Sequence, residues 1–190
     1  MRVIGGTLGG RALRAPVGTD TRPTPALVRG AVFAALEARV SAGAAPPLAE
    51  WTALDLFAGT GALGIEALSR GCAQAWLVER APAALRALRA NVADLGLEGR
   101  AHVVAGPVER FLRDAPLRDL QPQLVMADPP YAAGAAGVLE SLADAAWLPA
   151  SAFVVLQHAS REELPARSGN LARMWCRLYG ASGVSIFVPG

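Results

Sequence analysis

A glycine-rich loop is the first segment of the chain whose residues could do chemistry. It reads DLFAGTGALG and runs from Asp55 to Gly64. Its glycines match the pattern G-x-G-x-x-G, and Glu79 follows 20 positions after Gly59. This spacing is typical of a site for a nucleotide-like cofactor, whose ribose hydroxyls would donate to an acidic side chain at the end of the next strand.

Asp55 separates the two classes of cofactor that share this geometry, dinucleotides and S-adenosylmethionine. A carboxylate at the end of the strand that precedes the loop would repel a pyrophosphate. S-adenosylmethionine has no phosphate, and its ammonium and sulfonium would be attracted. The loop therefore favours S-adenosylmethionine, while a dinucleotide-dependent oxidoreductase stays open as the enzyme alternative.

A second motif, Asp128-Pro129-Pro130-Tyr131, directly follows the apolar run at 124–127. The Asp128 carboxylate and the Pro129 carbonyl could accept the two N–H bonds of an exocyclic amine on a base. The prolines would stiffen the loop, and Tyr131 could stack on the base. These four residues are our predicted catalytic group, which would act mainly by positioning; proton acceptance by Asp128 is a further option.

Positive charge gathers at the beginning of the chain. The net charge is +2 and no lysine occurs, but residues 1–30 hold five arginines against one acid, Asp20. The planar guanidinium suits phosphate, and a base in folded RNA must be unpaired or flipped before this chemistry can reach it. We expect nucleic-acid contacts from the N-terminal segment, with a merely solvated basic face as the alternative; the candidates are Arg2, Arg11, Arg22, Thr24 and Arg29.

Elements of an α/β fold must position these residues, because short apolar runs alternate with helical patterns. A weak hairpin pattern over 1–22 and a helix after Thr24-Pro25 form an N-terminal extension that ends in the small-residue loop before residue 48. We predict parallel strands, crossover helices and a final antiparallel pair. The strands are expected at 53–57, 75–79, 101–105, 124–127 and 152–156, the helices at 62–70, 82–95, 108–114 and 135–146, and the pair at 171–179 and 184–188.

Composition narrows the class of protein. With 190 residues and 53% apolar side chains, the chain predicts one globular unit, and no apolar run approaches the roughly 20 residues that span a bilayer. The start is too short and too glycine-rich for a signal peptide, so we expect a cytoplasmic protein. Cys72 and Cys176 are far apart in sequence, which predicts neither a disulfide framework nor a metal site.

Taken together, the motifs resemble those of the RsmD-type family, which methylates the N2 amine of a guanine in 16S ribosomal RNA. The resemblance spans nearly the whole chain and rests on Arg2-Val-Ile-Gly-Gly, Thr21-Arg-Pro-Thr24, the block from Asp55 to Gly71, Glu79 and Asp128 to Tyr131. It implies a Rossmann-like seven-stranded methyltransferase domain over 48–190, an RNA-contacting extension over 1–47 and S-adenosylmethionine as donor. The cofactor residues that we expect are Asp55, Phe57, Ala58, Gly59, Thr60, Gly61, Glu79, Arg80 and Val108.

Three positions depart from the pattern of that family. Gly30 replaces a glutamate, Pro107 stands where a side chain commonly meets the adenine, leaving the Val108 N–H for that contact, and Gln157-His158 replaces a common glutamate. We expect His158 to be a surface residue at a strand end.

We expect a monomer without a membrane partner. Its expected partner is 16S rRNA, alone or in a partly assembled 30S subunit. Another amine acceptor, namely a DNA adenine or cytosine or a protein amide, and an inactive RNA-binding protein remain alternatives.

Overall fold

One mixed sheet of eight strands forms the framework of the computed structural model, which describes residues 1–16, 26–115, 117–130 and 134–190. Its strand order is β3-β2-β1-β4-β5-β8-β7-β6. The strands are β1 (Thr52–Leu56), β2 (Gln74–Glu79), β3 (Ala101–Ala105), β4 (Leu124–Ala127), β5 (Phe153–Ala159), β6 (Arg167–Ser168), β7 (Leu171–Tyr179) and β8 (Ser182–Pro189).

Strands β1 to β5 pair in parallel, whereas β8 is antiparallel to β5 and β7 is antiparallel to β8. This confirms the predicted α/β class and the terminal antiparallel pair. The two-residue strand β6, which pairs with the start of β7, was not predicted because two residues carry no periodicity. It adds an eighth strand to the seven that the resemblance implied.

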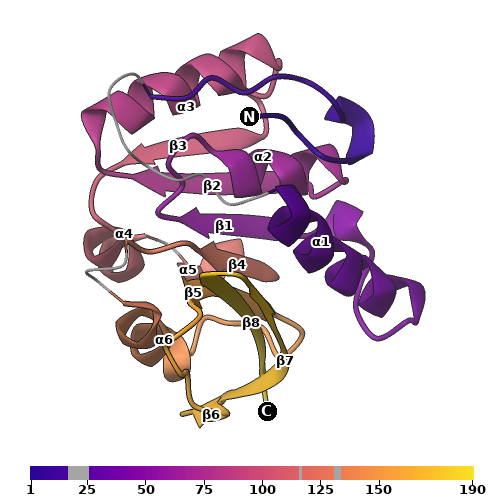
Figure 1. The fold of residues 1–190 in the computed structure, drawn as a ribbon, viewed down its shortest axis with the longest axis vertical. Helices are drawn as coiled ribbons and strands as arrows, with labels where there is room; N and C mark the ends of the chain where they lie inside the picture. The colour runs from indigo at the N-terminus through magenta and orange to yellow at the C-terminus, as the bar shows by residue number, and fades with distance from the viewer. Residues whose placement is uncertain (17–25, 116, 131–133) are drawn as a thin grey trace.

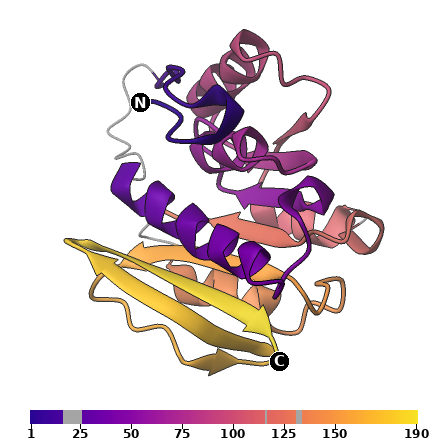
Figure 2. The same cartoon turned by 90° about the vertical axis from the view of Figure 1, so that its right-hand side faces the viewer.

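Helices cover both faces of the sheet (Figures 1 and 2). Along β1, Ala53 belongs to the buried cluster that includes α1, α2 and α3, and Leu54 belongs to the cluster of α4, α5 and α6. This follows from the alternation of side chains along a strand, which gives a doubly covered sheet two apolar faces. The helices are α1 (Ala26–Ser41), α2 (Ala62–Ser69), α3 (Pro82–Asp94), α4 (Val108–Asp114), α5 (Leu117–Leu120) and α6 (Ala135–Ala143), with short 3₁₀ turns at Gly6–Leu8 and Leu48–Glu50.

The N-terminal segment, residues 1–16, is a loop that folds back on itself rather than a regular hairpin. A single antiparallel bridge joins Arg2 to Ala12, and the turn between them contains the 3₁₀ helix. Val3 and Leu13 are buried in the same cluster as α1 and the sheet. The segment therefore shares the main core instead of hanging from it, and the boundary expected at residue 47 stays a prediction.

Polar side chains of α2 also hold this segment. Glu66 is fully buried, and its carboxylate accepts hydrogen bonds from the backbone N–H of Ile4 (2.8 Å) and of Gly5 (2.9 Å). The Arg70 guanidinium donates to the same carboxylate at 2.7 Å, so the buried charge is paired. Ser69 adds a bond from the N–H of Leu8. The sequence motif around Glu66 is thus largely an attachment site for the N-terminus.

No helix in the described parts of the chain is both long enough and apolar enough to cross a membrane.

Candidate active site

The strand order reverses between β1 and β4, which are neighbours in the sheet but are followed by helices on opposite faces. At such a switch point the loops diverge and leave a crevice at the carboxyl ends of the strands. A pocket of about 650 Å³ lies there. It brings together both motifs of the sequence, and its lining includes Asp55, Phe57, Ala58, Gly59, Thr60, Glu79, Arg80, Val108, Asp128, Pro129 and Pro130.

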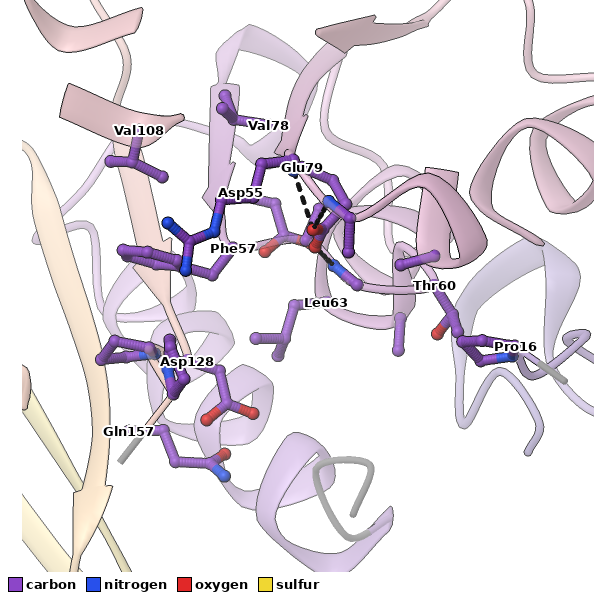
Figure 3. A pocket seen from close by; sticks show the side chains of 18 of the residues that line it. Pro16, Asp55, Phe57, Thr60, Leu63, Val78, Glu79, Val108, Asp128 and Gln157 are labelled. Carbon is purple, nitrogen blue, oxygen red and sulfur yellow. Dashed lines mark hydrogen bonds between the residues drawn. The ribbon is translucent and has the colours of Figure 1, made fainter. Parts of the chain in front are cut away.

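Glu79 at the end of β2 organises the glycine loop through its carboxylate. One oxygen accepts the N–H of Gly59 at 2.8 Å, and the other accepts the N–H groups of Arg80 (2.8 Å) and Ala81 (2.7 Å), as Figure 3 shows. Each carboxylate oxygen can accept more than one bond, so the side chain can bind a hydroxyl while keeping these contacts.

Asp55 lies below the loop and is 1% exposed. Its carboxylate accepts the N–H of Gly64 at 2.8 Å. The pKa of Asp55 is raised to about 7, chiefly by burial and also by the nearby Asp128 and Glu79 carboxylates, whereas the Gly64 N–H opposes the shift. A cation in the pocket would favour the ionised form, because it would offset the repulsion among these three carboxylates.

At two glycines of the loop, an added Cβ would lie too close to a neighbouring side chain. Gly61 has φ +83°, and a Cβ there would lie 2.4 Å from Leu88 Cδ1. A Cβ on Gly64 would lie 2.1 Å from Leu77 Cδ2 and 3.2 Å from Asp55 Oδ2. The last glycine of the motif thus brings α2 close to β1 and β2, which is the packing role expected of it.

Phe57 has a feature that sequence reasoning missed. Its φ is +67°, a conformation that bulky side chains rarely adopt, and it lines the pocket directly after β1. Such backbone strain is concentrated at functional sites. The predicted strand 53–57 therefore ends one residue early, at Leu56.

The acceptor motif lies across the pocket from the glycine loop. Asp128 is half-buried, Pro129 is buried and Pro130 is exposed, and all three line the pocket together with Gln157 at the end of β5. Figure 3 shows the Asp128 and Gln157 side chains extending toward the same space. Tyr131 lies outside the described residues.

The arginines expected at RNA occupy different environments. Arg2 and Arg11 are exposed, and Arg22 and Thr24 lie outside the described residues. Arg29 is only 1% exposed, and its Nη2 donates to the backbone oxygen of Arg2 at 2.7 Å. The expectation that Arg29 contacts phosphate is wrong in this structure, because its guanidinium is buried between α1 and the N-terminal segment.

The N-terminal segment also reaches the pocket, which the sequence did not indicate. Met1, Ala15 and Pro16 line it beside the glycine loop. Neither apolar type nor spacing signals such a contact, since the segment arrives there through long-range attachment to α2 and α3. Among the described residues, no group of three or more His, Cys, Asp or Glu side chains could hold a metal ion.

Comparison with known proteins identifies the family to which this chain belongs. The family model described as "Conserved hypothetical protein 95" matches residues 1–188. The protein of Escherichia coli (strain K12) named "Ribosomal RNA small subunit methyltransferase D" is 34% identical over 171 residues, which cover 90% of this chain and 80% of that protein. The chain belongs to the RsmD family.

Two further relatives of this RsmD-family chain match almost end to end. "Putative rRNA methyltransferase YlbH" of Bacillus subtilis (strain 168) is 36% identical over 188 residues, 98% of both chains. A solved structure of a hypothetical protein from Thermus thermophilus has a TM-score of 0.81, 35% identity and coverage of 98% of both chains. The fold is the Rossmann-like methyltransferase fold, and the family is one of methyltransferases.

The structure shows where the residues at the three positions that depart from the RsmD pattern lie. Gly30 lies within α1, where an added Cβ would meet only Ile4 Cγ2 at 3.9 Å. Val108 begins α4 and lines the pocket. His158 is 5% exposed, and its Nε2 lies 3.1 Å from Ser185 Oγ. The expectation of a surface histidine is therefore wrong, because β8 covers this end of β5.

Proposed function

We propose that this RsmD-family protein transfers a methyl group from S-adenosylmethionine to the N2 amine of a guanine in small-subunit ribosomal RNA. The observation that carries the proposal is the single pocket that Asp55 and Asp128 share, at the ends of the adjacent strands β1 and β4. One carboxylate would attract a cationic donor, and the other would hold an amine acceptor. A methyl transfer needs both in reach of one another.

The residues of the pocket fit S-adenosylmethionine. Asp55 is a buried carboxylate whose hydrogen bond comes from the neutral N–H of Gly64, and the ammonium and sulfonium of the donor would complement its charge. Glu79 would accept the ribose hydroxyls, and Val108 would lie against the adenine. Phe57, Ala58, Gly59 and Thr60, which line the pocket, would form the wall on the methionine side, and Arg80 the rim. Gly61 does not line the pocket and would contribute through the turn of the loop, where its φ is +83°. A pyrophosphate would meet the Asp55 carboxylate, which disfavours a dinucleotide.

Bound S-adenosylmethionine would supply an electrophilic methyl group. Asp128 and the carbonyl of Pro129 would accept the two N–H bonds of the guanine amine, so that its nitrogen lone pair points at the methyl carbon. The N–C bond would form as the S–C bond breaks and returns its electron pair to the sulfur, and the amine proton would leave to Asp128 or to water. Tyr131 is proposed as the stacking partner of the base. The positioning of the amine is the main contribution of these residues.

Ribosomal RNA is the acceptor that the relatives favour, because the related proteins of E. coli and B. subtilis carry rRNA methyltransferase in their names. The exposed Arg2 and Arg11 of the N-terminal segment support it, since they offer guanidinium groups on the same segment that reaches the pocket through Ala15 and Pro16. We propose that Arg22 and Thr24 continue this contact. The protein would act as a monomer in the cytoplasm on 16S rRNA.

The test is transfer of labelled methyl from S-adenosylmethionine to small ribosomal subunits from a strain that lacks the protein, followed by nucleoside analysis. We expect label as 2-methylguanosine with the wild type and with Asp119→Ala, which removes an exposed carboxylate on α5, and no label with Asp128→Ala. A parallel reaction on protein-free 16S rRNA tests whether the assembled subunit is needed.

Label in another nucleoside would overturn the choice of guanine, and label in a ribosomal protein would move the reaction to a side-chain amide. Absence of label with the wild type, despite a thermal shift with S-adenosylmethionine, would identify an inactive binding protein.

A further inference from the structure

Asn91 is a buried polar side chain that none of the roles above uses. It lies on α3 and is 1% exposed. Burying a primary amide is costly unless its donors and its acceptor are all engaged, so the partners of this side chain indicate what it is for.

Those partners belong to two different segments of the chain, both of which reach the pocket. The Asn91 amide nitrogen donates to the backbone oxygen of Thr60, in the glycine loop, at 2.9 Å. It also donates to the backbone oxygen of Arg14 at 3.2 Å, and its own oxygen accepts the N–H of Arg14 at 2.7 Å. One side chain therefore ties the glycine loop to the N-terminal segment.

Both tied segments contact whatever fills the pocket. Thr60 lines it, and so do Ala15 and Pro16, which directly follow Arg14. Figure 3 shows Pro16 and Thr60 at the same end of the pocket, with Asp128 at the opposite end. A ligand that settles against Thr60 thus also restricts the segment that begins at Arg14, because the Asn91 amide keeps the two at a set spacing.

We propose that Asn91 is a positioning residue that couples cofactor occupancy of the glycine loop to the conformation of the N-terminal segment. The inference rests on the proposed function, since it takes S-adenosylmethionine as the ligand. When the pocket is filled, the segment with the exposed Arg2 and Arg11 loses conformational freedom before RNA arrives. By linkage, whatever binds the ordered segment strengthens cofactor binding by the same factor.

Hydrogen exchange followed by mass spectrometry tests the coupling on the intact protein, without RNA and without turnover. With saturating S-adenosylmethionine, the amides of Leu13, Arg14 and Ala15 are expected to exchange more slowly in the wild type, by about fivefold or more, the lower end of typical coupling. In Asn91→Ala we expect less than about twofold slowing, although thermal shift still reports cofactor binding.

Asp94→Ala is the matched control. Asp94 lies one turn further along α3 and pairs with the side chain of the same Arg14 at 2.6 Å, but its carboxylate is exposed and does not touch the glycine loop. This variant should keep the full cofactor-dependent slowing. If Asn91→Ala does not fold, Asn91→Leu decides: this apolar side chain of similar size fills the same space without burying a charge and removes both donors, so the cofactor-dependent slowing should disappear.

Equal cofactor-dependent slowing in the wild type and in the folded Asn91 variant would overturn the inference while leaving the proposed function intact. So would loss of the slowing in Asp94→Ala, because any loosening of the segment would then suffice. A wild type that shows no thermal shift with S-adenosylmethionine would overturn both proposals.

Discussion

The two halves of the pocket reach the same sheet edge by different means. The cofactor half, residues 55–61 with Glu79, is built from hydrogen bonds between buried or half-buried carboxylates and backbone N–H groups, and from glycines packed against neighbouring side chains. The acceptor half, Asp128 to Pro130 with Gln157, is a short strand end stiffened by two prolines.

Because of this difference, substitutions in the two halves of the pocket should have different effects on stability and on turnover. Changes in the cofactor half disturb contacts inside the core, because Asp55 and Gly64 pack between β1, β2 and α2. Changes at Asp128 alter a half-buried side chain at the pocket wall. We therefore expect the first group of variants to affect stability together with binding, and the second to affect turnover alone.

The largest expected effect is the loss of turnover in Asp128→Ala. Removing the group that orients the amine, and that is available to accept its proton, should lower kcat by about 10²- to 10⁴-fold. Asp128→Asn, which keeps one acceptor oxygen, should lose less. The measurement is single-turnover methyl transfer at saturating cofactor. A matching fall in cofactor affinity in either variant would contradict the separation of the two halves.

The next effect is the pH dependence of cofactor affinity that follows from Asp55. Its pKa is raised to about 7, so the pocket without cofactor holds it protonated below that pH. A cationic ligand favours the carboxylate, so affinity should fall about tenfold for each pH unit below 7 and level off above it. Calorimetric titration between pH 5.5 and 8.5 measures this, and Asp55→Asn, which cannot ionise, should give a nearly flat profile.

The raised pKa of Asp55 should also make the stability of the cofactor-free protein fall as the pH rises, whereas cofactor affinity rises with pH. The folded pKa of Asp55 lies above the unfolded value of 3.8, so the unfolded chain releases this proton at lower pH than the native protein does. The contribution of Asp55 to stability is therefore present below about pH 4 and is lost as the pH rises toward 7. The wild type minus Asp55→Asn difference in free energy of unfolding, measured by urea titration, should decrease over that interval; an increase would mean that Asp55 is ionised in the folded protein.

Two glycine-to-alanine substitutions, one on each of the helices that follow the two halves of the pocket, should have smaller effects. Gly64→Ala would force a methyl group against Leu77 and Asp55, which should cost about 1–3 kcal/mol of stability, and so lower Tm by several degrees, and should also weaken cofactor binding. Thermal denaturation with and without cofactor measures both. A Tm equal to that of the wild type would show that α2 can shift without affecting Asp55.

Gly137→Ala is the counterpart on α6 and the smallest expected change. This glycine is exposed within the helix, and nothing lies within 4 Å of an added Cβ. The substitution should stabilise the protein by up to about 1 kcal/mol, because alanine restricts the unfolded chain and favours the helix. Turnover should not change. A loss of turnover in this variant would mean that the acceptor half depends on the packing of its helix as the cofactor half does.

Much of the fold could be predicted because it depends on local patterns. The strands before Phe57 and Asp128 were placed within one residue by their apolar runs, and α2, α3 and α4 by helical periodicity. The pocket residues of both motifs followed from one rule, that parallel strands end at a common edge. Elements of four residues or fewer, such as α5 and β6, are too short to show a period.

The burial of a side chain could not be predicted where it depends on parts of the chain that are distant in sequence. Arg29 was expected at RNA because it belongs to the N-terminal group of arginines, and His158 at the surface because it ends a strand, yet both are buried by segments far away in sequence. Glu66 and Asn91 gave no signal either, since an acid or an amide within a helix is usually solvated. Their partners include backbone groups of the N-terminal segment, which no side-chain pattern can reveal.

By itself, the sequence determined the α/β class, the order of its main elements and the two motifs that meet at one edge of the sheet, because periodicity and strand polarity are local properties. Only the tertiary structure decided that the N-terminal segment lines the pocket, that the pKa of Asp55 is raised to about 7, chiefly by burial, and that Asn91 joins the glycine loop to the N-terminal segment. These features arise from burial and from hydrogen bonds between residues distant in the chain, and both exist only once the whole core has packed.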